Sequence, residues 1–179
     1  MSKLKVKGYN WGSLQERIIL HLAKNGPKNI NRTAKEISSH YKSTHTAFTS
    51  LKEKGFIKKV STMTYPQYWL TFEGLFLALI SGSNPKILIN TYEKLHGKSE
   101  EMDLVFELAN ILPSEELGRL YNSCKFTKEG VEIYLPIPMN PKTAKIWRKA
   151  LKKSPKYQKI VYRILKQAID ELPKEGVKP

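Results

Sequence analysis

Residues 42 to 54 carry the side chains of this chain that are best suited to binding a partner. In a helix, one buried stripe is expected at positions i, i+3, i+4 and i+7, formed by Thr44, Ala47, Phe48 and Leu51. The other positions carry hydroxyl, imidazole and ammonium groups, and no carboxylate occurs before Glu53. Such groups hydrogen-bond to phosphate oxygens and to the edges of bases. This pattern predicts a nucleic-acid-binding helix face, and a merely solvated face is the alternative.

The preceding residues predict a helix that would position this face. Residues 31 to 40 have a helical pattern that buries Ala34 and Ile37, with Tyr41 closing the turn. Small side chains such as Ala34 and Ala47 let two helices cross closely through a short turn. Gly55 is expected to end the second helix in a left-handed conformation. Residues 31 to 59 are therefore predicted to form a helix, a turn, a second helix and the first strand of a hairpin.

The elements on either side of this segment also have clear sequence signals. Ser13 and Glu16 have the spacing of a capping box, which predicts a helix that ends at Gly26 and Pro27. Residues 56 to 60 and 67 to 71 are strand-like and are joined by a turn, so they predict a hairpin. Thr71 is expected to cap a buried helix over residues 72 to 80.

This arrangement resembles the winged-helix DNA-binding domain of prokaryotic transcriptional regulators of the broad MarR and PadR type. The resemblance covers about residues 11 to 80, and it depends on two motifs. The first is Lys54-Gly55-Phe56-Ile57 at the start of the hairpin, and the second is Leu70-Thr71-Phe72-Glu73-Gly74 at its end. The resemblance implies that residues 42 to 52 lie in a major groove while the wing, residues 61 to 66, touches the flanking backbone or minor groove.

The DNA contacts that follow from this reading are hydroxyl and basic side chains of the helix and hairpin. They are Lys42, Ser43, His45, Thr46, Thr49, Ser50, Lys52, Lys58, Lys59, Thr62 and Thr64. Members of this family often carry arginine on the helix and at the wing tip, where this chain has threonine. We therefore expect contacts through hydroxyl groups, methyl groups and water, and a modest sequence preference.

The net charge is +15 and is unevenly distributed along the 179 residues. Residues 1 to 80 carry 13 Lys and Arg against 4 Asp and Glu, a net of +9; residues 93 to 132 carry 5 against 9, a net of −4; and residues 141 to 167 carry 10 against none. The chain should therefore present two basic surfaces separated by an acidic one. A field of this sign attracts nucleic acid or anionic membrane.

Two accounts of the second basic region remain open. Its side chains could contact additional phosphates, or they could face the acidic helix of residues 100 to 116, within the chain or across a dimer. The possible secondary phosphate contacts are Lys145, Arg148, Lys149 and Lys152. Trp147 lies on an apolar face, so we expect it in a core or a dimer interface.

The remaining residues of the second half predict mostly helices. Helices are expected over residues 84 to 96, 99 to 112 and 114 to 124, with Cys124 on the apolar side of the third. Residues 131 to 135 alternate like a strand, but the prolines that follow allow at most an edge piece or a tethering arm. Two basic helices start at Pro141 and Pro155, and the second has a long apolar stripe that suits a dimer interface.

The predicted fold is α+β and mostly helical, with an N-terminal winged-helix domain at residues 1–82 and a C-terminal helical domain at residues 83–179. The C-terminal domain would serve dimerisation or the binding of an effector or partner.

Several kinds of chemistry lack a sequence signal. There is no phosphate-binding glycine loop, no dinucleotide fingerprint and no nucleophile elbow, so we do not expect an enzyme or a cofactor. The one cysteine excludes an internal disulfide, and the four histidines lack metal-ligand spacing. No apolar run reaches the roughly 20 residues that cross a bilayer, and the start lacks a signal peptide. We therefore expect a cytoplasmic protein with no membrane partner.

The leading hypothesis is a transcriptional regulator that binds double-stranded DNA as a homodimer. Two alternatives stay open: an architectural or replication protein with little sequence preference, and a protein-interaction module built on a winged-helix scaffold.

Overall fold

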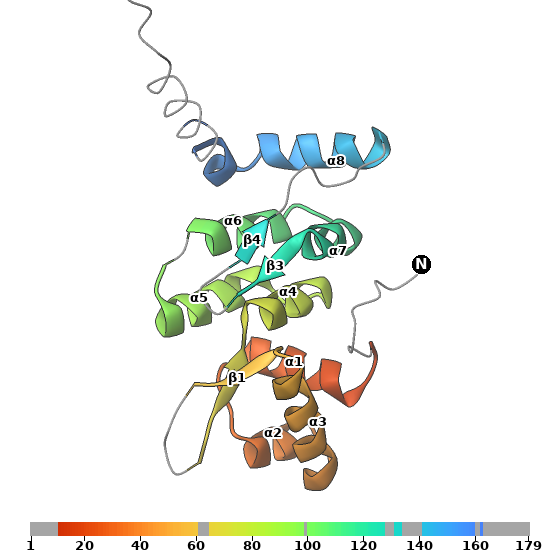
Figure 1. Ribbon diagram of the computed structural model, residues 1–179, viewed down its shortest axis with the longest axis vertical. Helices are drawn as coiled ribbons and strands as arrows, with labels where there is room; N and C mark the ends of the chain where they lie inside the picture. Colours follow the sequence, from red (N-terminus) through yellow and green to blue (C-terminus); the bar gives the residue numbers. More distant parts are fainter. Residues whose placement is uncertain are drawn as a thin grey trace, which may run out of the picture.

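The computed structural model describes residues 11–60, 65–98, 100–127, 131–133, 141–159 and 162 (Figure 1). This part of the chain is mostly helical with two small antiparallel sheets, which makes it an α+β fold. The elements of the first half are α1 (Leu14–Asn25), α2 (Ile30–Glu36), α3 (Tyr41–Glu53), β1 (Ile57–Lys59), β2 (Tyr68–Leu70) and α4 (Phe72–Ile80). Those of the second half are α5 (Pro85–His96), α6 (Glu100–Ala109), α7 (Ser114–Asn122), β3 (Cys124–Phe126), β4 (Val131–Ile133) and α8 (Pro141–Lys152).

Side-chain caps begin several of these helices where the sequence predicts them. The Ser13 hydroxyl accepts a hydrogen bond from the Gln15 N–H at the start of α1. The Glu16 carboxylate accepts from the N–H of Gly12, one residue before the position that a capping box would use. Asn84 caps α5 with Pro85 in its first turn.

The two motifs that carry the family resemblance meet at one junction between α3, the hairpin and α4. The Phe56 N–H donates to Leu51 O at the end of α3 (2.9 Å), and the Thr71 N–H donates to Phe56 O (3.1 Å). The Thr71 hydroxyl donates to Gly55 O (2.6 Å) and accepts from the Gly74 N–H (3.2 Å). A Cβ at Gly74 would lie 2.0 Å from Phe56 O, so only glycine lets the hairpin approach α4 this closely. The junction fixes α3 and the hairpin relative to α4.

Helix α4 lies at the centre of the core, with α1 against one side and α7 against the other (Figure 1). Its residues from Gly74 to Leu79 are all buried, as its composition predicts. The buried apolar side chains form one cluster that extends from Ile18 in α1 to Ala150 in α8. The elements that carry the candidate site are therefore supported by the same core as the second half of the chain.

The structure corrects the expected end of α2. The prediction extended this helix to about residue 40, whereas α2 ends at Glu36. Ser38 has a φ of 51°, a left-handed conformation that breaks the helix. Tyr41 does not close the turn; it is the first residue of α3, and its side chain is 52% exposed.

A second correction concerns Cys124. The predicted helix over residues 114 to 124 ends at Asn122, and Cys124 begins strand β3. Strand β4 pairs antiparallel with β3, with Cys124 opposite Ile133, so the strand-like pattern at residues 131 to 133 belongs to a second hairpin. Helices in the described part of the chain are all too short or too polar to cross a bilayer.

Candidate nucleic-acid interface

Helix α3 buries the predicted stripe and exposes the predicted binding face. Thr44, Ala47, Phe48 and Leu51 are at most 8% exposed, and Gly55 follows the helix with a φ of 79°. At 100° per residue, the side opposite this stripe carries Lys42, Thr46, Thr49 and, at its C-terminal end, Glu53. His45 and Lys52 flank this line on one side, and Ser43 and Ser50 flank it on the other.

The N-terminal end of α3 is the more favourable end for an anion. The cap residue His40 makes no side-chain capping hydrogen bond, and the first turn contains no acidic residue. Backbone N–H groups at such an end attract phosphate because they are aligned with the positive end of the helix dipole. Lys42 is exposed in the same turn. Glu53 lies at the opposite end, so the charge along α3 favours phosphate near its start.

The Thr46 hydroxyl already has one hydrogen bond. It donates to Lys42 O in the preceding turn (3.1 Å). Its oxygen therefore faces a partner as an acceptor, and its methyl group is available for apolar contact with a thymine methyl. Thr49, one turn further along, is also exposed.

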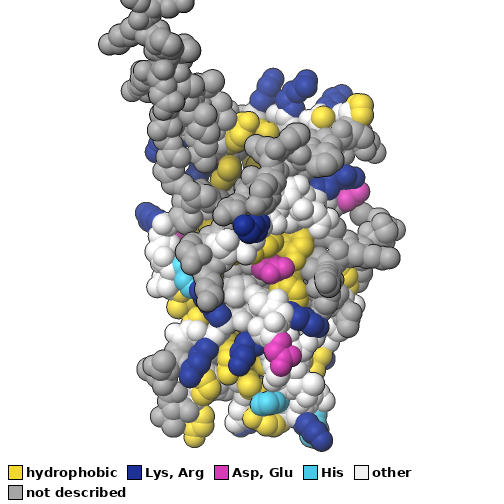
Figure 2. All heavy atoms as spheres, viewed as in Figure 1, with side chains coloured by type: hydrophobic (Ala, Val, Ile, Leu, Met, Phe, Trp, Pro, Cys, Tyr) yellow, Lys and Arg dark blue, Asp and Glu magenta, His cyan; other side chains and the backbone are white. Residues whose placement is uncertain are grey.

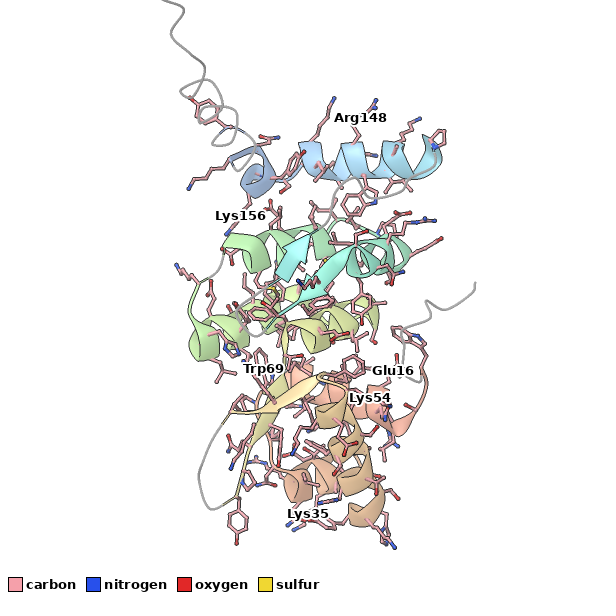
Figure 3. All side chains as sticks on the ribbon, viewed as in Figure 1. Glu16, Lys35, Lys54, Trp69, Arg148 and Lys156 are labelled. Carbon is pink, nitrogen blue, oxygen red and sulfur yellow. The ribbon has the colours of Figure 1, made fainter. Side chains whose placement is uncertain are left out.

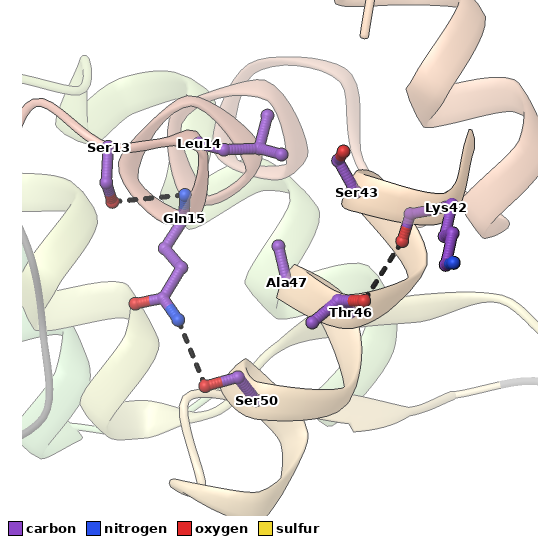
Figure 4. A pocket seen from close by; sticks show the side chains of 8 residues that line it. All are labelled: Ser13, Leu14, Gln15, Lys42, Ser43, Thr46, Ala47 and Ser50. Carbon is purple, nitrogen blue, oxygen red and sulfur yellow. Dashed lines mark hydrogen bonds between the residues drawn. The ribbon is translucent and has the colours of Figure 1, made fainter. Parts of the chain in front are cut away.

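A groove separates the start of α1 from α3 (Figure 4). It is lined by Ser13, Leu14, Gln15, Lys42, Ser43, Thr46, Ala47 and Ser50. Gln15 Nε2 donates to the Ser50 hydroxyl oxygen across the groove (3.0 Å). Ser50 is therefore half-buried and already paired, which makes it a weaker candidate contact than Ser43. Gln15 was not predicted as a site residue, because the sequence does not show that α1 begins beside α3.

The hairpin places its two predicted lysines on opposite faces. Lys59 pairs with Tyr68, whose ring meets Phe48 of α3 edge-on, with 5.6 Å between ring centroids. Lys58 pairs with Trp69 instead, and successive strand residues point to opposite sides of a sheet. Partial burial lowers the pKa of Lys58. Only Lys59 therefore lies on the side of the hairpin that faces α3.

Lys58 instead belongs to the surroundings of His96 at the end of α5. The His96 ring stacks on Trp69 at 5.9 Å between centroids. Burial lowers the pKa of His96, and the nearby Lys58 charge lowers it further. The predicted contacts Thr62 and Thr64, at the tip of the hairpin, lie outside the described residues.

Glu36 offsets several cations next to α3. Its carboxylate pairs with Arg32 Nε at 2.7 Å, His21 Nε2 at 2.8 Å and Lys28 Nζ at 3.4 Å. The hydrogen bond from Arg32 is the main reason that the pKa of Glu36 is lowered to about 2. Lys35 on the same helix is exposed at the α2–α3 end of the molecule (Figure 3). It is a candidate phosphate contact that the sequence reading missed.

The four predicted secondary contacts share the outer face of α8. Lys145, Arg148, Lys149 and Lys152 are exposed, whereas Trp147 and Ala150 on the opposite side are 5% and 2% exposed. Trp147 is thus a core residue, as predicted. Lys and Arg side chains gather over α8 in Figure 2. This helix lies at the opposite end of the molecule from α2 and α3 (Figure 1).

Neither a metal site nor an activated thiol was found among the described residues. No group of three or more His, Cys, Asp or Glu in this part of the chain could hold a metal ion. Burial raises the pKa of the Cys124 thiol to about 12, which disfavours the reactive thiolate. No protein-family model matches the chain, and no curated protein is significantly similar to it.

Proposed function

We propose that the chain is a transcriptional regulator that binds double-stranded DNA through a winged helix. In this proposal α3 enters the major groove, and the hairpin β1–β2 lies on the flanking backbone. The order of elements supports it: a capped helix, two helices joined by a short turn, a hairpin, and a buried helix that fixes the hairpin. The N-terminal domain would comprise residues 1–82.

The observation that carries the proposal is the outer face of α3. Lys42, Thr46 and Thr49 lie in line on its exposed side, and the first turn has neither an acidic residue nor a side-chain cap. Phosphate would bind at the start of the helix, and the threonines would face base edges. Lys59 and Lys35 would add phosphate contacts on either side of α3.

The chemistry of this face favours affinity from lysines and a modest sequence preference. Arginine, which reads guanine through two parallel hydrogen bonds, is absent from α3. Thr46 and Thr49 would distinguish base pairs through their acceptor oxygens and methyl groups. These contacts are weaker than the paired hydrogen bonds of arginine. The same observation favours a second candidate function, an architectural protein that binds duplex DNA with little regard to sequence.

The proposed assembly is a homodimer whose two α3 helices meet half-sites about one helical turn apart. The expected dimer seam is the apolar stripe from residue 157 to residue 172, most of which lies outside the described residues. Light scattering on the full chain, with and without residues 155 to 172, tests the seam. An intact dimer after the deletion would place the interface elsewhere.

Selection of bound sequences from a random DNA pool, followed by substitution of the threonines, tests the function. We expect T46A/T49A to weaken the selected site more than random duplex, because only base contacts are lost. Thr91→Ala is the matched control, since Thr91 in α5 makes the same type of hydroxyl bond, to Ile87 O at 3.3 Å. A pool that converges on no site supports the architectural function instead. Equal losses on both duplexes would show that the threonines do not read bases.

A further inference from the structure

Helix α8 presents a dense, single-sign surface that the proposed function does not use. Its outer residues Lys145, Arg148, Lys149 and Lys152 have the spacing i, i+3, i+4 and i+7, so they form one line on the helix. We call these four side chains the α8 basic face. Helix α8 contains no acidic residue at all.

This charge pattern is unfavourable for an isolated helix. Like charges three or four residues apart destabilise a helix, and the α8 basic face contains several such pairs. The first turn has no acidic residue, so α8 also lacks the favourable interaction that a carboxylate makes with the helix dipole. A polyanion bound along the face would relieve the repulsion. A helix that is merely solvated gains nothing from this pattern.

The apolar side of α8 packs against the rest of the molecule. Trp147 Nε1–H donates to the buried Glu116 carboxylate of α7 (2.8 Å). Just beyond α8, Lys156 forms an ion pair with Asp103 of α6, while Arg148 lies on the outward side (Figure 3). The acidic helix therefore engages Lys156, and the α8 basic face points away from it.

We propose that the α8 basic face binds the phosphate backbone of a second DNA segment, so that one chain bridges two duplexes. This inference rests on the proposed function of α3. The two surfaces lie at opposite ends of the longest axis of the molecule, with the core between them (Figure 1). A short straight duplex seated on α3 cannot also contact α8 of the same chain.

Duplex DNA suits this surface better than an anionic membrane does. An interfacial helix inserts its apolar side into the lipid, but the apolar side of α8 is occupied by Trp147 and Ala150 packed in the core. Phosphates on a duplex occur about every 1.7 Å along its axis, which suits a continuous line of cations. Contacts of this kind add affinity without reading sequence.

The test uses the full-length chain and two short duplexes that carry the α3-selected site, one immobilised and one fluorescent. We expect the wild type to retain the fluorescent duplex on the surface. The variant K145Q/R148Q/K149Q/K152Q should lose this bridging, yet keep its affinity for a single selected duplex within a few-fold. The matched control K24Q/K86Q/K94Q/K98Q removes four exposed charges elsewhere and should still bridge. The slope of log affinity against log salt for the second duplex should fall by about 3 to 4 without the α8 basic face.

The outcomes separate this inference from the proposed function. The inference is overturned if the α8 variant still bridges two duplexes, or if the control variant loses bridging as much as the α8 variant does. Neither result bears on the proposed function of α3. Absence of bridging by the wild type, or binding to phosphatidylserine vesicles that excess duplex does not displace, also overturns the inference. If T46A/T49A keeps every preference and the α8 variant loses all DNA binding, the proposed function of α3 fails and the bridging of two duplexes fails with it, which leaves the α8 basic face as a single DNA-binding surface.

Discussion

Helices α3 and α8 are both basic and similar in length, but they differ in what accompanies their charge. The outer line of α3 combines one lysine with two threonines and ends at Glu53. The outer line of α8 consists of lysine and arginine alone. Hydroxyl and methyl groups can distinguish one base pair from another, whereas a row of ammonium groups responds to phosphate. Under the proposed function, this difference favours sequence preference at α3 and affinity without sequence preference at α8.

The two helices also differ in how they are positioned. Helix α3 is fixed mainly through backbone hydrogen bonds at Phe56 and Thr71, with a further bond from the Thr71 hydroxyl to Gly55 O, and these bonds join it to the hairpin and α4. Helix α8 packs on the core through Trp147 and Ala150, and its polar anchor is a side-chain hydrogen bond, from Trp147 to Glu116. A backbone junction sets the angle of a helix closely, as base reading requires. A helix that only has to present charge tolerates a looser attachment.

Among the substitutions that test how the two helices are positioned, Gly74→Ala is expected to have the largest effect on the free energy of unfolding. In Gly74→Ala the added Cβ would meet Phe56 O at 2.0 Å, and neither backbone can move without disturbing the junction. We expect the free energy of unfolding to fall by about 3 kcal/mol, the upper part of the range for overpacking. Urea denaturation followed by circular dichroism measures it.

Gly82→Ala is the control for this substitution. Gly82 has a φ of 91°, but its Cβ would meet no atom within 4 Å. The alanine there introduces backbone strain alone, and we expect a loss of about 1 kcal/mol. Equal losses at the two glycines would show that close approach to Phe56 does not limit the junction.

The junction also shows what a sequence can and cannot predict here. The bounds of α3 and the cap at Thr71 were predicted closely, because the periodic stripe, Gly55 and the threonine are local signals. The end of α2 was missed, since serine at residue 38 gives no local sign of its left-handed conformation. Cys124 was placed in a helix because the apolar pattern continues past Asn122, where the chain begins a strand.

Other parts of the site depend on long-range packing. Lys58 and Lys59 are adjacent and equally basic, and only the register with Trp69 and Tyr68 separates their faces. The bond from Gln15 to Ser50 spans 35 residues and that from Trp147 to Glu116 spans 31. No local pattern signals such pairs.

An effect of intermediate size on the free energy of unfolding is expected when either of the two buried tryptophans is replaced by phenylalanine, and the two losses should differ. Trp147→Phe removes a donor to the buried carboxylate of Glu116, whereas Trp69→Phe removes a donor to the neutral carbonyl of Leu22 (3.1 Å). Both changes remove the same atoms. We expect losses of about 2 and about 1 kcal/mol respectively, because hydrogen bonds to charged groups are the stronger. Chemical denaturation of both variants measures the difference.

The tryptophan variants should also help to separate DNA bridging from sequence preference. Trp147→Phe should weaken DNA bridging while the preference for the selected site is kept, since α8 is far from α3. A greater loss of stability at Trp69 than at Trp147 would show that the charged hydrogen bond does not dominate the anchoring of α8.

The smallest of these effects on the free energy of unfolding is expected at Glu36. This residue is the acid among the cations at the α3 end of the molecule, whereas α8 contains no acid. The pKa of Glu36 is lowered from 4.5 to about 2, chiefly by the hydrogen bond from Arg32. A carboxyl whose pKa is lower in the folded state stabilises the fold above its unfolded pKa. That contribution is lost as the pH falls from about 4.5 to about 2. Glu36→Gln should therefore flatten the fall in unfolding free energy over this window, as measured by urea titration at several pH values.

Lys149→Gln is the control for Glu36→Gln, since it changes a surface charge on α8 without removing a carboxylate. In Lys149→Gln the unfolding free energy should fall with decreasing pH as it does in the wild type. If the same fall persists in Glu36→Gln, groups other than Glu36 cause it. At neutral pH the loss of Glu36 also frees the charge of Arg32 and Lys28. Affinity for all duplexes should then rise slightly and the salt slope should steepen, while the selected site keeps its advantage. A change in preference instead would mean that Glu36 positions α3, and that the cations beside it do more than attract phosphate.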